Sequence, residues 1–139
     1  MIYLDNGATS FPKPKVVEDG ISEWFRKGSG SPGRSKYGPA RGATQRVANT
    51  RSRLARFFGV KDPQRLIFTY GATDGLNMSI KGFLKQGDHV IITSMEHNSV
   101  LRPLKHLERE GKISLSIAPC DEKGYLILPK LWELFTDKT

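Results

Sequence analysis

The sequence has 139 residues, of which 37% are hydrophobic and 26% charged, and its formal net charge is +8. A chain of this length can form one domain and bury roughly two thirds of its unfolded surface, and no apolar run approaches the roughly 20 residues that span a bilayer. The single cysteine, Cys120, excludes internal disulfides, and the first residues carry no secretory signal pattern, so we expect a cytoplasmic protein without a membrane partner.

The positive charge is concentrated in one block. Residues 26–65 hold 11 of the 22 Lys and Arg residues and one acid, Asp62, which gives the block a charge of +10 and leaves −2 for the rest. Such a block can bind nucleic acid or an anionic cofactor, or it can be a solvated helix face.

The first third of the chain predicts an arm and two helices. Residues 1–15 read as an extended arm, because Pro12 and Pro14 prevent a helix from starting before Lys15. One helix follows and ends at Gly28. The glycine-rich stretch 28–38 is predicted to be a binding loop, since a plain linker would not need its Arg34, Lys36 and Tyr37. A second helix then starts at Pro39 and is closed by Gly59, with its arginines mostly on the solvated faces.

The stretch Phe68–Asn77 is the part of the sequence that says most about function. It predicts a strand over Arg65–Tyr70, a sharp turn at Gly71 and a new helix, which Thr73 or Asp74 can cap. The apolar spacing of the new helix fits one buried face (Leu76, Ile80, Phe83, Leu84). Free N–H groups and the positive dipole end at such a turn form a seat for a phosphate. Neither common nucleotide-binding glycine loop is present, so ATP and dinucleotides are not expected here.

The last third continues the alternation of strands and helices. A buried strand at His89–Thr93 is followed by a helix that ends at Gly111, a strand alternating through residues 113–117, a turn at Asp121–Gly124 and a short helix over Pro129–Phe135. This order predicts an α/β fold with a parallel sheet. Three parallel strands with few helices make a poor domain on their own, so the chain reads as the first part of something larger.

Five stretches together resemble the N-terminal part of the class V aminotransferase family, in particular the cysteine desulfurases. They occur in the family's order and spacing, at residues 3–10, 30–34, 67–73 with Asn77, 87–91 and 96–104, and the resemblance covers essentially the whole chain. The resemblance implies the type I fold of pyridoxal-phosphate (PLP) enzymes, with a parallel-type sheet flanked by helices. Residues 16–139 would then be an incomplete N-terminal part of the large PLP-binding domain, and the enzyme would be a homo-oligomer.

The resemblance also implies site residues. Gly71, Ala72 and Thr73 look like the cofactor phosphate loop, and His97 looks like the catalytic histidine that lies against the pyridine ring. Residues Asn6, Gly7 and Ala8 are similar to the segment that edges the substrate carboxylate. The implied reaction removes sulfur from L-cysteine or a similar amino acid, with a sulfur acceptor protein as a further partner.

The sequence departs from the family pattern at two positions. Tyr70 stands where the family usually has a small or polar residue, and Gly7 stands where alanine is common. The resemblance places the rest of the machinery beyond Thr139, including the Schiff-base lysine and the acid that pairs with the pyridine nitrogen. We therefore expect the chain to be inactive by itself.

Two other functions remain open on the sequence alone. The first is a small basic nucleic-acid-binding module, for which no binding signature is present, so nucleic acid is not the partner we expect. The second is a non-catalytic interaction fragment of the same fold. No metal site is expected, because no two His or Cys residues stand at ligand spacing on one element.

Overall fold

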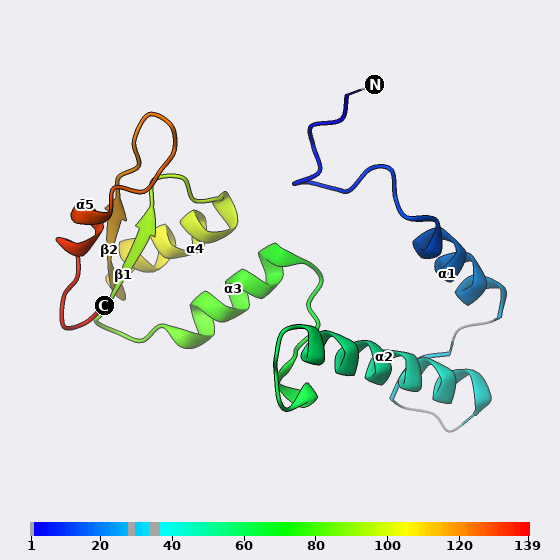
Figure 1. The fold of residues 1–139 in the computed structure, drawn as a ribbon. Coiled ribbons are helices and arrows are strands. Elements are labelled where there is room, and N and C mark those ends of the chain that lie inside the picture. The colour runs from blue at the N-terminus through cyan, green and yellow to red at the C-terminus, as the bar shows by residue number, and fades with distance from the viewer. Residues whose placement is uncertain (1, 28–29, 34–36) are drawn as a thin grey trace. The chain divides into compact units, whose positions relative to one another are not determined.

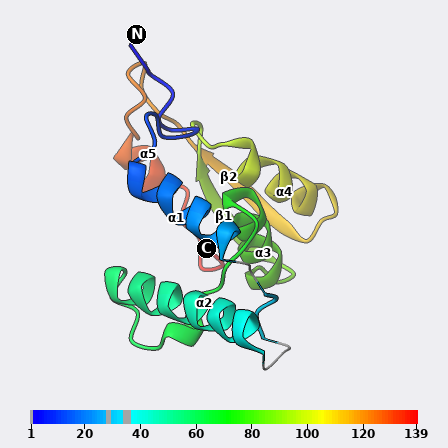
Figure 2. The same ribbon diagram turned by 90° about the vertical axis from the view of Figure 1, so that its right-hand side faces the viewer.

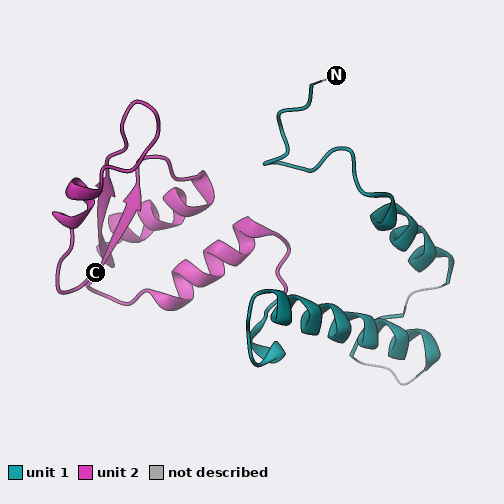
Figure 3. Cartoon of the chain, viewed as in Figure 1, with its two compact units in different colours: residues 1–67 teal, residues 68–139 magenta. Residues whose placement is uncertain are grey.

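The computed structural model describes residues 2–27, 30–33 and 37–139 (Figure 1). The chain divides into two compact units, which are coloured separately in Figure 3. Unit 1 ends at Ile67, and unit 2 runs over Phe68–Thr139. The predicted boundary after residue 15 is a different division and stays a prediction. Arg34 and Lys36 of the predicted binding loop lie outside the described residues.

Unit 1 consists of the helices α1 (Lys15–Arg26) and α2 (Gly38–Phe57) and the short 3-10 helix η1 (Pro63–Arg65). The predicted end of α2 is confirmed, because Gly59 has a φ of +69° and the Val60 N–H donates to the Ala55 carbonyl at 2.8 Å. This is the Schellman arrangement that a glycine after a helix favours. The helix α2 buries only small side chains: Ala40, Ala43 and Ala55.

The loop between the two helices of unit 1 comes very close to the start of α2. A Cβ added to Gly30 would lie 2.4 Å from the Ala40 nitrogen, so only glycine fits there. The Gly33 N–H donates to the Thr44 hydroxyl at 3.0 Å. The guanidinium carbon of Arg46 lies 5.0 Å from the ring centroid of Trp24, a cation–π contact that joins α2 to α1.

Unit 2 is the α/β part of the chain, as predicted. Its elements are α3 (Ala72–Phe83), β1 (Asp88–Thr93), α4 (Asn98–Arg109), β2 (Ile113–Ala118) and α5 (Leu128–Trp132). The two strands pair in parallel, from Asp88 opposite Ile113 to Thr93 opposite Ala118. Figures 1 and 2 both show α4 beside this strand pair.

The core of unit 2 lies between the sheet and α4. It contains Ile92, Leu104, Leu107 and Ile113, and Ile80 of α3 packs against it. The helix α4 contributes Leu104 and Leu107 to this core, and Leu101, on the same side of the helix, packs against it partly buried. Beside this core, an apolar hollow of about 670 Å³ stays open, and we call it the open apolar face; its lining includes Leu76, Phe83, Leu84, Val100, Leu131 and Phe135.

Two predictions for the middle of the chain are wrong. Residues 65–70 do not form a strand. Arg65 is the last residue of η1, a short helix that begins after Asp62, whose carboxylate accepts the Gln64 N–H at 3.0 Å. Residues 66–69 belong to neither described strand. The described residues thus contain two strands rather than three. The physical reason is that a strand is stabilised by a partner strand, and this stretch spans the junction of the two units.

Candidate cofactor site

At the start of α3 the structure has the sharp turn at Gly71 and the new helix that the sequence predicts. Gly71 is the N-cap, with φ +152° and ψ 176°, a backbone conformation that residues other than glycine rarely adopt. The Gly71 carbonyl accepts the Gly75 N–H at 3.0 Å and the Thr69 hydroxyl at 3.0 Å. The predicted capping is wrong: neither Thr73 nor Asp74 caps the helix. Instead the Asp74 carboxylate accepts the Tyr70 N–H at 3.2 Å, just before the N-cap.

The first N–H groups of α3 are open to an anion. Among the described residues, no acceptor binds the N–H groups of Ala72, Thr73 or Asp74, and all three residues are exposed. They border a hollow of about 510 Å³ that is completed by Tyr70, Gly71 and Asn77. Three unbonded N–H groups, the Thr73 hydroxyl and the positive end of the helix dipole are the donors that a phosphate needs. The Asp74 carboxylate is the one group in this lining that would repel a phosphate, and one of its oxygens already accepts a hydrogen bond from the Tyr70 N–H.

His97 lies at the equivalent place on α4, because it is the N-cap of that helix. Its ring nitrogen Nδ1 accepts the Ser99 N–H at 3.2 Å and lies 2.8 Å from the Ser99 hydroxyl oxygen. The turn leading to it is held by the Thr93 hydroxyl, which donates to Glu96 Oε1 at 2.9 Å. The imidazole is exposed, while Ser99 is buried.

One hollow joins the two helix starts. It has a volume of about 470 Å³, and its lining includes Thr73 and Asn77 from α3 and His97 from α4. The packing of α3 against α4 brings these residues together. Asn77 also borders the phosphate turn, and its side-chain NH₂ donates to the Thr73 carbonyl at 2.9 Å, which holds the first turn of α3.

The hollow is positively charged. Its lining includes Lys81, Arg102 and His106 and, among the residues that the structure describes, no carboxylate. Among the described residues, no acid forms an ion pair with Lys81 or Arg102, whereas His106 Nε2 lies 3.3 Å from Glu110 Oε1. A hydrogen bond from Lys112, followed by the charge of His106, lowers the pKa of Glu110 below its usual value. A negatively charged ligand therefore meets a favourable field in this hollow.

The predicted substrate residues Asn6, Gly7 and Ala8 belong to unit 1. They form an exposed turn in which the N–H groups of Ala8 and Thr9 donate to the Asp5 carbonyl at 3.1 and 3.2 Å. The Asn6 side-chain oxygen accepts the Phe11 N–H at 3.2 Å. Their role at a substrate carboxylate stays a prediction.

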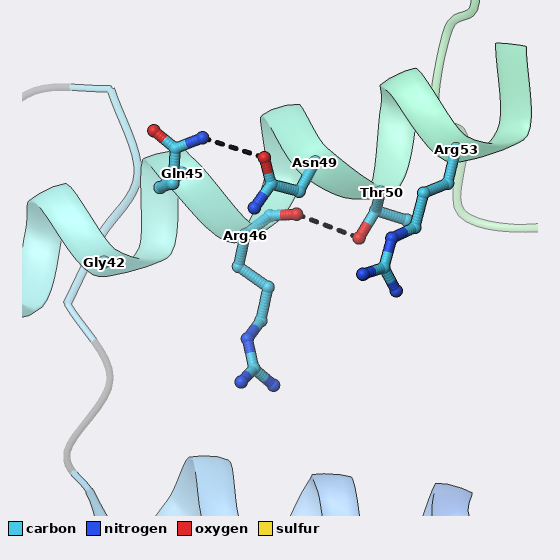
Figure 4. A pocket seen from close by; sticks show the side chains of 6 residues that line it. All are labelled: Gly42, Gln45, Arg46, Asn49, Thr50 and Arg53. Atoms are coloured by element: carbon cyan, nitrogen blue, oxygen red, sulfur yellow. Dashed lines mark hydrogen bonds between the residues drawn. The ribbon is translucent and has the colours of Figure 1, made fainter. Parts of the chain in front are cut away.

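A second polar hollow runs along α2 and is shown in Figure 4. Its hydrogen bonds are local to the helix: Gln45 Nε2 donates to Asn49 Oδ1 at 2.8 Å, and the Thr50 hydroxyl donates to the Arg46 carbonyl at 2.9 Å. Arg46 is engaged with Trp24, and the side chains belong to one helix face. This hollow carries the arginines of a solvated face and does not favour the nucleic-acid alternative.

The other candidate residues have structural surroundings. His89 is buried, and its ring nitrogens lie 2.7 Å from Thr139 Oγ1 and 2.8 Å from Ser116 Oγ. Cys120 is half-buried. Across the described ranges, no three His, Cys, Asp or Glu residues are grouped to hold a metal ion, and no helix is long and apolar enough to cross a membrane.

Comparison with known proteins decides the family. The family model for aminotransferase class-V matches residues 2–139. The chain belongs to this family. A cysteine desulfurase from Cronobacter sakazakii is 31% identical over 143 residues, which cover all of this chain and 35% of that relative. The chain thus spans about a third of the length of the curated relatives it matches.

Solved structures agree with this class V assignment. The apo structure of a cysteine desulfurase from Thermococcus onnurineus matches with a TM-score of 0.84 and 28% identity, over 96% of this chain and 34% of that one. A C-DES mutant with glycine covalently linked to its PLP cofactor matches with a TM-score of 0.71 and 20% identity, over 91% and 33% of the two chains, and shows the fold alone. The prediction of a PLP-enzyme α/β fold is confirmed by these similarities.

Sequence reasoning missed one residue of this site. Ser99 fell within a matched stretch, but no role was predicted for it. A signal was available in the sequence: a serine stands two residues after a histidine at a helix start. At this spacing the side chain of the first residue can accept a hydrogen bond from the backbone N–H of the second.

Proposed function

We propose that this chain is the N-terminal part of a PLP-dependent enzyme of the cysteine desulfurase type, which takes sulfur from L-cysteine and leaves alanine and a persulfide. The observation that carries the proposal is the shared hollow, in which Thr73 at the start of α3 and His97 at the start of α4 meet. Class V membership and the names of the relatives support the same reading.

The residues present fit a PLP phosphate. The N–H groups of Ala72, Thr73 and Asp74 and the Thr73 hydroxyl would bind its oxygens, with Gly71 allowing the turn. His97 would lie against the pyridine ring and donate or hold a proton there. When bound, the cofactor supplies an electron sink for breaking bonds at the amino acid's α-carbon. Residues Asn6, Gly7 and Ala8 would line the substrate carboxylate through their backbone.

No described lysine lines the hollow at the phosphate turn. Lys85 and Lys105 lie near the end of α3 and on α4, and Lys105 is paired with Glu108 at 2.8 Å. Lys81 lines the shared hollow from a surface position two turns into α3. We therefore propose that the chain binds PLP reversibly and that turnover belongs to a longer or assembled enzyme, a cytoplasmic homo-oligomer that passes sulfur to an acceptor protein.

A PLP titration followed by absorption spectroscopy tests this proposal. We expect saturable binding that is lost on desalting, with pyridoxal, which lacks the phosphate, binding much more weakly. Thr73→Ala should weaken PLP binding about tenfold or more, because a hydrogen bond to a charged group contributes about 1.5–3 kcal/mol. Thr50→Ala on α2 is the matched control and should leave the affinity unchanged.

Equal affinity for PLP and pyridoxal, or an affinity that Thr73→Ala leaves untouched, would refute the phosphate seat. A band that survives desalting, disappears in one Lys→Ala variant and shifts on adding L-cysteine would show instead that the chain carries its own covalent anchor.

A further inference from the structure

The contact between His97 and Ser99 fixes where the imidazole proton resides. The Ser99 backbone N–H can only donate, and it points at Nδ1 over 3.2 Å. A proton on Nδ1 would face this N–H directly, so Nδ1 must be the unprotonated nitrogen of the neutral ring. The Ser99 hydroxyl, 2.8 Å from the same Nδ1, then donates as well.

The proton of the neutral ring is consequently on Nε2. Within the described residues no acceptor contacts Nε2, and His97 lines the hollow that it shares with Thr73. Ser99 itself is 8% exposed, so its hydroxyl is largely removed from competing water, and its bond to Nδ1 is the one hydrogen bond found for that oxygen in this part of the chain.

We propose that Ser99 is a positioning residue that holds His97 as the Nε2–H tautomer and so presents a hydrogen-bond donor, rather than a base, to the hollow. The consequence for the reaction rests on the proposed function: the neutral ring would donate through Nε2 to an electronegative atom of cofactor or substrate. The tautomer itself depends only on the contacts of Ser99.

Nitrogen NMR of the histidine rings tests the tautomer without any ligand. In the full chain labelled with ¹⁵N and studied with its histidine rings neutral, we expect Nδ1 of His97 to resonate as an unprotonated nitrogen and Nε2 as a protonated one. Ser99→Ala removes one of the two donors, so the ratio of the two tautomers should fall about two- to tenfold, the effect of one neutral hydrogen bond. Ser99→Thr, which keeps the hydroxyl, should restore the ratio.

Ser116→Ala is the matched control, because the Ser116 hydroxyl contacts a different ring, His89, at 2.8 Å. It should alter the His89 signals and leave those of His97 unchanged. A His97 ring with its proton on Nδ1 in the wild-type chain, or a tautomer ratio that Ser99→Ala leaves unchanged in a folded variant, would overturn the proposal. Failure of PLP to bind would leave these ring signals as they are, so the two proposals fail separately.

Discussion

Replacing Gly71 with alanine tests whether the glycine conformation of the turn before α3 is needed for stability and for phosphate binding. A Cβ at Gly71 meets no atom within 4 Å, so the substitution creates no clash, and its cost comes from the backbone alone. A residue with a Cβ held at φ +152° and ψ 176° costs about 1–3 kcal/mol. For a unit of this size each kcal/mol lowers Tm by about 4–8 °C, so we expect a drop of at least about 4 °C.

The assay is a thermal melt followed by circular dichroism, combined with a titration of inorganic phosphate. If the turn relaxes to avoid the strain, the N–H groups of Ala72 and Thr73 lose their alignment, and phosphate affinity should fall together with Tm. Gly82→Ala is the control, since Gly82 lies in the last turn of α3, away from the phosphate turn, with open space around it, and alanine favours a helix more than glycine does. A Gly71→Ala variant with wild-type melting and wild-type phosphate affinity would refute this reasoning.

Three further predictions concern other parts of the chain. Gly30→Ala should destabilise unit 1, because its Cβ would lie 2.4 Å from the Ala40 nitrogen, whereas Gly42→Ala, in open space on α2, should not; a proteolysis comparison that ranks them equally contradicts this packing. The chain should self-associate through its open apolar face, and light scattering that finds a monomer at high concentration would exclude it. Lys112→Gln should return the lowered pKa of Glu110 toward its usual value. Because folding lowers the pKa of Glu110, its ion pair with Lys112 stabilises the fold at pH values above the unfolded-state pKa. This stabilisation is lost as the pH falls through the folded-state pKa. NMR titration of the Glu110 carboxylate in the wild-type and Lys112→Gln proteins measures the change.

Local signals in the sequence predicted most of the helices and turns. Gly59 and Gly111 end helices in left-handed conformations, as expected from glycine after an apolar helix stripe. The turn at Asp121–Gly124 is also confirmed: the Asp121 carboxylate accepts the N–H groups of Lys123 and Tyr125. Each of these features depends on residues that are close in sequence.

Features that depend on distant partners were less accessible. Residues 65–70 have the composition of a strand, but a strand also requires a neighbour with which to pair, and composition does not specify one. The proximity of Thr73 and His97 follows from the packing of α3 on α4. The apolar stripes of the two helices indicate that each has a buried face, but they do not specify that these faces pack on each other. The role of Ser99 depends on side-chain geometry at one helix start.

The measurement that tests the central claim most directly is an amide and histidine-ring NMR titration of the labelled chain with PLP. If the starts of α3 and α4 form one cofactor site, the N–H signals of Ala72, Thr73 and Asp74 and the ring signals of His97 should shift together, with a single apparent affinity. Shifts confined to the arginine-bearing helix α2, with the residues of the shared hollow unmoved, would contradict the account.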